Sequence, residues 1–374
     1  MKEAAQAETP RFELMKLSDF DYSLPAERIA QRPLGDRASA RMLLVKRAEE
    51  GLEDRSFAEL PKLLRGDELV VVNNTRVLPA RLFGWRRGIR AEKGGKHAAE
   101  FLTAEIEVLL TRQIEPDVWE ALVRPGRKVR VGEQVVFASG ELEAEVIGRG
   151  ELGLRQLRFA AKGGVKEAIE RLGHTPLPPY IERADDEADR TDYQTIFARE
   201  SGAVAAPTAS LHFTPEVVAA MKARGVELCE ITLHVGLGTF QPIHEKDVEQ
   251  HKIHSEAYEI SEVAEEQIAR ARSTKRPVLA IGTTVVRALE DAAQKGESHG
   301  FAVGAGKAEA QIFIRPGHEF RIVDHLLTNF HLPKSSLLVL VAAFAGRERI
   351  LRAYQHAIAQ GFRFCSYGDC MLIR

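Results

Sequence analysis

Histidines and one nearby carboxylate gather in the second half of the chain, around the ends of predicted strands and loops. His212, His234 and His331 each follow an apolar or alternating stretch, and His254 lies two residues before Glu256. An imidazole or carboxylate in such a place can move a proton, because its pKa lies near neutrality or is brought there by its surroundings. The set therefore favours acid–base chemistry; a histidine that only satisfies a hydrogen bond in the core is the plainer alternative.

Two turns rich in glycine and threonine are each predicted to follow a strand. Glu230–Val235 alternates apolar and polar residues and runs into Gly236-Leu237-Gly238-Thr239-Phe240, and Pro277–Ile281 runs into Gly282-Thr283-Thr284 at a helix start. Small residues at a strand end let the backbone approach a ligand, and the free amides of a helix start can receive a carboxylate or phosphate, here with Arg287 one turn away. Plain turn formation and plain helix capping are the alternatives.

Two further polar segments lie near the C-terminus. Thr328–Ser336 leads into the wholly apolar helix Leu337–Ala345, which must be buried and would hold the loop rigidly beside the sheet. Phe362–Ser366 is predicted to be a strand that ends at Tyr367-Gly368-Asp369. Asp369 is therefore a candidate for binding or acid–base chemistry, unless it only shapes a turn.

Candidate contacts for a nucleic acid lie in the first half of the chain. Asn74 and Arg76 follow a buried-type strand at Asp67–Val72, and an arginine fork suits phosphate. Clusters of cations occur at Arg86–Lys96 and at Arg124–Arg130, which includes Arg127 and Lys128. Such clusters can follow an RNA backbone, but small ones are more often plain solvated surface.

Composition bounds the class of protein. The chain has 374 residues, of which 44% are hydrophobic, so it is long enough for two domains. Charged residues make up 28% and the net charge is -2, so the protein as a whole has no positive field that would attract a polyanion. Cys229, Cys365 and Cys370 form no C-x-x-C pair, which indicates a reducing cytosol. The pair His251 and His254 lacks a third ligand at a zinc spacing, so we expect no metal. Leu337–Ala345, the longest apolar run, is too short to cross a bilayer.

Helix and strand patterns alternate along the chain and are interrupted by a run of short β segments. This order predicts an α/β protein with an inserted β module. We expect a flexible extension over 1–14, a mixed-sheet α/β main domain over 15–80 and 163–374, and a small barrel or sandwich over 81–162. A charged, exposed stretch at Glu182–Asp192 is expected at the seam between the domains. The inserted strands are predicted at Arg81–Trp85, Glu105–Leu110, Val118–Val123, Lys128–Phe137, Leu142–Ile147 and Leu154–Phe159.

Together these segments resemble one family, the S-adenosylmethionine:tRNA ribosyltransferase-isomerases of queuosine biosynthesis, over roughly Met15–Arg374. The resemblance rests on residues 24–31 (LPAERIAQ), 74–77 (NTRV), 177–181 (LPPYI), 205–209 (AAPTA), 211–213 (LHF), 232–236 (TLHVG), 238–240 (GTF), 282–287 (GTTVVR), 328–335 (TNFHLPKS) and 366–369 (SYGD). The chain departs from the family pattern at Ala203, Ser210 and Cys370 and in a longer, more charged segment at Arg86–Ala104.

The resemblance implies a fold and a reaction. The fold would be an α/β body with an inserted β-barrel. The ribosyl group of S-adenosylmethionine, a co-substrate, would be transferred and isomerised onto 7-aminomethyl-7-deazaguanine at the wobble position of a tRNA with a GUN anticodon, giving epoxyqueuosine and releasing adenine and methionine. No bound cofactor, no metal and no membrane are expected, and the protein would be a cytoplasmic monomer. An inactive tRNA-binding protein of this fold is one alternative. A conventional methyltransferase is disfavoured because Gln241 stands where a glycine-rich cofactor loop has its third glycine.

Roles for individual residues are hypotheses at this point, and all of them require distant loops to meet at one water-poor cavity. The expected acid–base groups are His234, His254, Glu256, His331 and Asp369. The expected S-adenosylmethionine contacts are His212, Gly236, Gly238, Thr239, Thr283, Thr284 and Arg287, of which the last three would hold the carboxylate. The expected RNA contacts are Asn74, Arg76, Arg124, Arg127 and Lys128.

Overall fold

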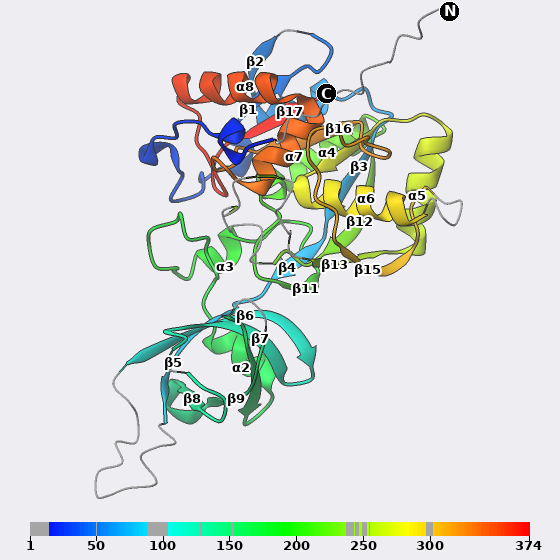
Figure 1. Ribbon diagram of the computed structural model, residues 1–374. Helices are drawn as coiled ribbons and strands as arrows, with labels where there is room; N and C mark the ends of the chain where they lie inside the picture. The colour runs from blue at the N-terminus through cyan, green and yellow to red at the C-terminus, as the bar shows by residue number, and fades with distance from the viewer. Residues whose placement is uncertain are drawn as a thin grey trace, which may run out of the picture.

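A large α/β body and a small β-barrel make up the computed structural model (Figure 1). The structure describes residues 15–49, 51–87, 104–127, 129–150, 153–236, 243, 247–248, 253, 255–296 and 302–374. The predicted extension over 1–14, the sites Lys128, Gly238, Thr239 and His254, and most of the basic segment Arg86–Lys96 lie outside these residues.

A mixed sheet forms the core of the body. In the described chain it has nine strands, ordered β15 (Gly306–Ala310), β13 (Glu256–Ile260), β12 (Glu227–Leu233), β3 (Leu69–Asn73), β14 (Val278–Ile281), β16 (His325–Asn329), β17 (Cys370–Ile373), β1 (Arg41–Val45) and β2 (Leu52–Ser56). The central four, β12, β3, β14 and β16, are mutually parallel, so their carboxyl ends meet at one edge. This edge is where open α/β sheets bind their ligands.

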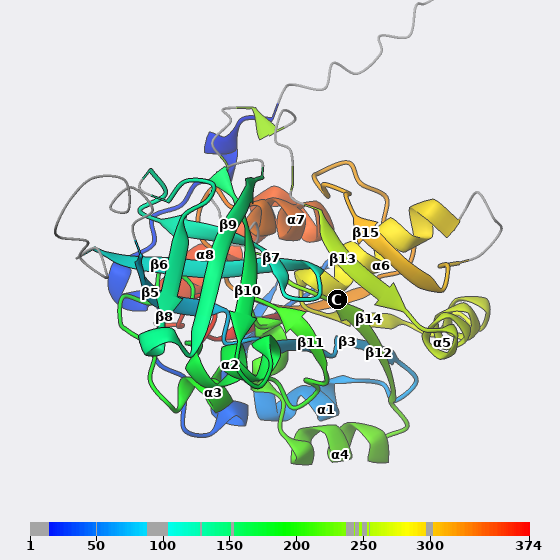
Figure 2. The ribbon, with the colours of Figure 1, turned by 90° about the horizontal axis from the view of Figure 1, so that it is seen from below.

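Helices cover both faces of the sheet. The helices α5 (Glu262–Ser273), α6 (Thr283–Gly296), α7 (Ser336–Ala345) and α8 (Arg347–Ala359) pack on the face that carries Leu69 and Val71. The helices α1 (Leu60–Leu63) and α4 (Pro215–Ala223) pack on the other face, which carries Val70 and Val72. Figure 2 shows α1 and α4 on the opposite side of the sheet from α6 and α7. Because β3 is covered on both faces, its run of four apolar residues is continuous and does not alternate with polar ones.

The inserted module is a closed antiparallel barrel, ordered β10 (Arg155–Ala161), β7 (Val118–Arg124), β6 (Glu105–Glu115), β5 (Arg81–Arg86), β8 (Gln134–Phe137) and β9 (Leu142–Arg149). The helix α2 (Val165–Leu172) packs Val165, Ala168 and Ile169 into the barrel core. The six predicted strands are therefore present, although β8 begins later than expected. All of them fall within 81–162; the division of the chain into domains at these boundaries stays a prediction.

A short parallel pair of strands joins the two parts. In Figure 1, β4 (Thr75–Val77) and β11 (Glu200–Ala203) lie between the barrel and the body. β4 directly follows the central strand β3, and β11 begins the segment that leads to the loop at residues 204–207. The groups on these two strands are therefore placed where the barrel and the ligand edge of the sheet meet.

Several local predictions were wrong. The sequence Gln311–Arg315, closed by Pro316-Gly317, also predicts a strand, but none forms there and the edge strand β15 ends at Ala310. The segment Phe362–Ser366 is irregular and forms only an isolated β-bridge between Phe364 and Ile29, and β17 begins only at Cys370. Asp369 therefore stands before a strand and not at its end. The sequence also predicts one helix over Ser56–Leu64, whereas the structure has a 3-10 turn, Phe57–Glu59, followed by the single turn α1.

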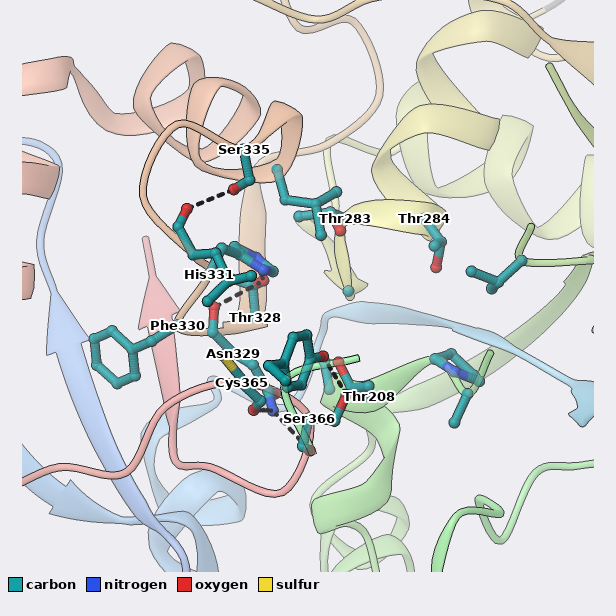
Figure 3. A pocket seen from close by; sticks show the side chains of 18 of the residues that line it. Thr208, Thr283, Thr284, Thr328, Asn329, Phe330, His331, Ser335, Cys365 and Ser366 are labelled. Carbon is teal, nitrogen blue, oxygen red and sulfur yellow. Dashed lines mark hydrogen bonds between the residues drawn. The ribbon is translucent and has the colours of Figure 1, made fainter. Parts of the chain in front are cut away.

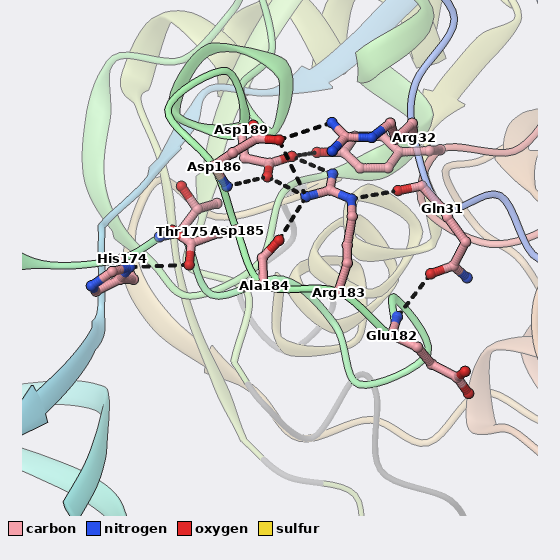
Figure 4. Close-up of polar contacts among 11 residues, drawn as sticks. Gln31, Arg32, His174, Thr175, Glu182, Arg183, Ala184, Asp185, Asp186 and Asp189 are labelled. Carbon is pink, nitrogen blue, oxygen red and sulfur yellow. Dashed lines mark hydrogen bonds and ion pairs between the residues drawn. The ribbon is translucent and has the colours of Figure 1, made fainter. Parts of the chain in front are cut away.

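The stretch Glu182–Asp192 was expected to be exposed, and this is only partly right. Asp189 is 1% exposed, and its carboxylate receives two hydrogen bonds from Arg183, at 2.6 and 2.7 Å. Arg183 also donates from Nε to the carbonyl of Gln31 (3.0 Å), and Arg32 pairs with Asp186 (2.9 Å), as Figure 4 shows. The connection that follows the barrel is thus fastened to the N-terminal part of the body, and it is not a free linker.

Candidate active site

A cavity of about 350 Å³ opens at the carboxyl edge of the central strands. Its lining comes from residues 179–180, 206–209, 235, 282–284, 328–333, 335, 337 and 365–366. Among the described residues, this lining contains no Asp, Glu, Lys or Arg. We call it the edge cavity; Figure 3 shows it with the α6 threonines on one side and His331 on the other. Apolar groups, hydroxyls, an amide and one imidazole thus surround whatever binds there.

The starts of two helices supply the polar character of the edge cavity. Gly282, at φ 94°, links β14 to α6 with a backbone conformation that side chains disfavour. Thr284 in the first turn of α6 is 7% exposed, and its Oγ1 has no hydrogen-bond partner within the described chain. Ser335 caps α7 by accepting from the Leu338 amide at 3.2 Å. Helix starts favour anions, so this cavity suits a carboxylate without a cationic side chain.

His331 lies in the edge cavity and is held from several directions. Its Nε2 lies 2.8 Å from Thr328 Oγ1, its backbone amide donates to the Tyr354 hydroxyl (3.0 Å), and its carbonyl accepts from the Tyr22 hydroxyl. Burial lowers the pKa of His331 to about 3. The ring is therefore neutral at pH 7, and its burial opposes the uptake of a second proton.

His212 lies behind the edge cavity and does not line it. Its Nε2 is 3.1 Å from Asn329 Oδ1, while Asn329 Nδ2 donates to the carbonyls of Cys365 (2.9 Å) and Ser366 (3.2 Å). Because that amide oxygen can only accept, His212 donates from Nε2. Burial lowers the pKa of His212 to about 4. His212 thus orients Asn329, which does line the cavity and which the sequence pattern marked only as part of a loop.

A second cavity, of about 540 Å³, lies between barrel and body. It is lined by barrel residues 111–113, 117, 119–120, 122 and 154, by α2 residues 165–166 and 169–170, and by body residues 78, 201–202, 234, 236, 255–257 and 309. We call it the interdomain cavity. His234 and Gly236 line this cavity and Val235 lines the edge cavity, so the two cavities are neighbours across residues 234–236. Trp119 is 8% exposed, and its indole Nε1 has no hydrogen-bond partner within the described chain.

Glu256 and Arg287 form a buried ion pair beside the interdomain cavity. Both residues are 4% exposed, and Arg287 Nη1 donates to Glu256 Oε2. The other carboxylate oxygen accepts from the Gly236 amide at 3.1 Å, and Arg287 Nη2 donates to the Ala310 carbonyl at 3.2 Å. Arg287 lines neither cavity. The expected carboxylate anchor therefore neutralises Glu256, and the pair holds the segment that separates the cavities.

His234 meets a hydroxyl on the joining strands. Its Nδ1 lies 2.8 Å from Thr75 Oγ1, and burial lowers its pKa. Asp369, by contrast, lines neither cavity: its carboxylate accepts from the amides of Arg41 (2.9 Å) and Arg363 (2.8 Å), although burial raises its pKa. The expected single cluster of His234, Thr284, His331 and Asp369 is thus divided between two adjoining cavities, with Asp369 outside both.

The expected RNA contacts fall into two groups. Arg76 makes a bidentate pair with Glu170 of α2, at 3.1 and 3.2 Å, and Asn74 accepts from Thr232 Oγ1 at 2.7 Å. These two side chains brace the joint between barrel and body. Arg124 and Arg127 are exposed on the barrel, Arg124 with a side chain that is 79% exposed. Of the described candidates, the barrel arginines are therefore the ones placed for contact with a polyanion.

Within the described residues, no group of three or more His, Cys, Asp or Glu side chains could hold a metal ion. A search of the same residues finds no helix with the length and apolar character needed to cross a membrane.

Fold and site together define an α/β enzyme with a ligand cavity at its sheet edge and a second cavity under an inserted barrel. The profile of the queuosine biosynthesis protein family matches residues 17–373. Curated relatives named S-adenosylmethionine:tRNA ribosyltransferase-isomerase include one from Solibacter usitatus, 52% identical over 96% of this chain and 100% of the relative, and one from Carboxydothermus hydrogenoformans, 48% identical with the same coverage. The crystal structure of S-adenosylmethionine tRNA ribosyltransferase from Thermotoga maritima is also similar, with a TM-score of 0.51, 33% identity and coverage of 95% of this chain and 100% of that one.

The chain therefore belongs to the queuosine biosynthesis family, and it is an enzyme. The family resemblance seen in the sequence is confirmed, as is the architecture of a mixed sheet with an inserted barrel.

Proposed function

We propose that this enzyme transfers and isomerises the ribosyl group of S-adenosylmethionine onto 7-aminomethyl-7-deazaguanine in tRNA, releasing adenine and methionine. Its tRNA would carry that base at the wobble position of a GUN anticodon, and the enzyme would act in the cytoplasm as a monomer without a metal. The names of its relatives support the reaction, and one structural observation carries it. Two cavities of different chemical character adjoin at His234, as a reaction between two separate substrates requires.

The edge cavity suits S-adenosylmethionine. Tyr180 supplies aromatic surface for a nucleoside, and the start of α6 with the unpartnered Thr284 hydroxyl suits the methionine carboxylate. The proton beside the sulfonium is acidified by the positive charge, and its removal starts the rearrangement that expels adenine. Reactive carbon of this kind must be shielded from water, which a cavity without charged side chains favours.

The interdomain cavity suits the modified base. Its lining includes five carboxylates, of which Glu256, Glu170 and Glu120 pair with Arg287, Arg76 and Arg112. Asp117 and Glu309 remain against the single cation Lys166. The aminomethyl group of the substrate is an ammonium ion at neutral pH, which such a lining attracts. The unpartnered indole N–H of Trp119 offers a donor to an acceptor on a base. The base would thus lie across His234 from the ribose that it attacks.

Incubating the full chain with S-adenosylmethionine and tRNA that carries the aminomethyl base tests the function. Free adenine together with a tRNA that has gained the ribosyl-derived mass is the expected result. S-adenosylhomocysteine would instead identify a methyltransferase. Tight tRNA binding without either product would identify a binding protein.

Replacing Thr284 by Val is expected to raise the KM for S-adenosylmethionine about 10–150-fold. The change removes one hydrogen bond to a charged group at nearly constant volume, and such a bond contributes about 1.5–3 kcal/mol. Decarboxylated S-adenosylmethionine provides the matched control, because it should bind wild type and T284V equally. An equal loss of affinity for both compounds would contradict the carboxylate assignment.

Replacing Arg124 and Arg127 by Gln is expected to weaken tRNA binding and to reduce its dependence on salt, by a slope of about 1 for each phosphate that is no longer neutralised. Binding of S-adenosylmethionine should not change, because both arginines lie on the barrel and line neither the edge cavity nor the interdomain cavity. Titrations of tRNA at several salt concentrations measure the slope. An unchanged slope would place the RNA elsewhere.

A further inference from the structure

The hydroxyl of Thr75 is placed so that it fixes which ring nitrogen of His234 carries the proton. Thr75 Oγ1 lies 2.8 Å from His234 Nδ1 and 3.3 Å from the backbone carbonyl oxygen of Glu200. A carbonyl oxygen can only accept, so the single hydroxyl proton of Thr75 serves that contact. The lone pair of the hydroxyl then accepts from the ring, which requires the proton of neutral His234 on Nδ1. Both contacts are satisfied only in this arrangement.

The other ring nitrogen, Nε2, is then a proton acceptor on a residue that lines the interdomain cavity. His234 lines that cavity, and Nε2 makes no hydrogen bond within the part of the chain that the structure describes. A neutral imidazole with Nδ1 anchored to a second group and Nε2 bare is the arrangement of a histidine base. Thr75 belongs to β4, which pairs with β11 between barrel and body, so the anchor is part of a rigid element.

Gly202 on β11 sets the position of the same ring. A β-carbon at residue 202 would lie 2.6 Å from Cε1, 2.7 Å from Nδ1 and 2.8 Å from Nε2 of His234. These are the nearest three atoms, and all belong to the imidazole. The absence of a side chain at Gly202 therefore makes room for the His234 ring. The ring therefore lies against the backbone at Gly202, and both residues line the interdomain cavity.

We propose that Thr75 and Gly202 are positioning residues for His234: they hold its imidazole with the proton on Nδ1 and the lone pair of Nε2 directed into the interdomain cavity, where it accepts a proton from the bound nucleotide substrate. In that step an N–H bond of the aminomethyl ammonium group breaks, its electron pair stays on the nitrogen, and the proton forms a bond to Nε2. The inference rests on the proposed function for the identity of the substrate, but the tautomer does not depend on it.

The tautomer is measured directly by nitrogen NMR of the full chain labelled with 15N-histidine, with the His234 signals assigned by their loss in His234→Gln. We expect the proton on Nδ1 in wild type, and a shift toward the other tautomer in Thr75→Val, which keeps the shape but not the hydroxyl. Thr75→Ser should behave as wild type. A proton on Nε2 in the wild type would overturn the proposal.

Kinetics provide the second test. Thr75→Val and Gly202→Ala should lower kcat for adenine release about 10–100-fold, as the loss of an outer partner of a histidine does, with KM for S-adenosylmethionine within about twofold of wild type. Gly35→Ala, where a new β-carbon meets nothing within 4 Å, is the matched control for a glycine change. Near wild-type kcat in both T75V and G202A would overturn the positioning role. Absence of adenine release by wild type would instead contradict the proposed function while the NMR result stands.

Discussion

Replacing Glu256 by Leu is expected to lower the free energy of unfolding by about 3–5 kcal/mol, because the Arg287 guanidinium would stay buried without its carboxylate. The same change removes the acceptor of the Gly236 amide, so the segment between the two cavities would lose its anchor. The rate of adenine release by the Glu256→Leu variant should also fall, because this segment borders both cavities. Urea denaturation followed by circular dichroism measures the first effect, and the adenine assay measures the second.

Two controls make this expectation specific. Glu259 lies on the same strand β13 but is exposed, and its nearest cation is Lys307 at 3.7 Å, so Glu259→Leu should cost less than about 1 kcal/mol. The double change Glu256→Leu with Arg287→Met removes both buried charges and should recover much of the loss. If E256L unfolds at the same urea concentration as wild type, the pair does not stabilise this site.

Acidification is expected to destabilise the protein through His212. Its pKa is about 6.5 in the unfolded chain but about 4 in the folded one, since burial disfavours the charged ring. The unfolded state therefore binds more protons between these values. The stability contributed by His212 is complete above about pH 6.5 and is lost as the pH falls toward 4, by about 3 kcal/mol in total.

His212→Gln tests this assignment. Glutamine keeps a donor for Asn329 Oδ1 but has no group that titrates in this range, so the variant should lose less stability than wild type between pH 7 and pH 4.5. Chemical denaturation at a series of pH values gives both curves. Parallel curves for the two proteins would show that other groups cause the acid sensitivity.

The elements that depend on local patterns could be predicted from the sequence. The six barrel strands, the wholly apolar helix α7 and the strand-to-helix turn at Gly282 all follow from alternation, apolar runs and glycine. The failures occurred where tertiary contacts decide. Gln311–Arg315 looks like a strand but lies beyond the edge strand β15, which ends at Ala310. The segment before Cys370 is shaped by the Asp369 carboxylate, which accepts from the amide of the distant Arg41 and from that of Arg363.

The sequence predicts which residues lie at the candidate site better than it predicts how they are arranged. Polar residues that end parallel strands share an edge, which is why Thr284 and His331 were expected at one cavity and do line one. His234 lines a second cavity because the barrel lies over β4 and β11. No local sequence pattern predicts that position of the barrel. The same holds for Arg287: its spacing from the helix start suited a ligand, but its partner Glu256 comes from an adjacent element 31 residues away. The roles assigned to single side chains stay predictions.

The order of strands in the body has a consequence for biosynthesis. β17, at residues 370–373, lies between β16 and β1, and so completes a sheet whose first members were made more than 300 residues earlier. The barrel, by contrast, pairs only strands that lie within 81–161. While the ribosome is still translating the second half, the barrel can already close. β3 keeps unsatisfied edges until β12 and β14 have been made, and β1 keeps one until β17 has been made. Nascent chains of this enzyme are therefore expected to be exposed to aggregation longest through the unpaired edge of β1.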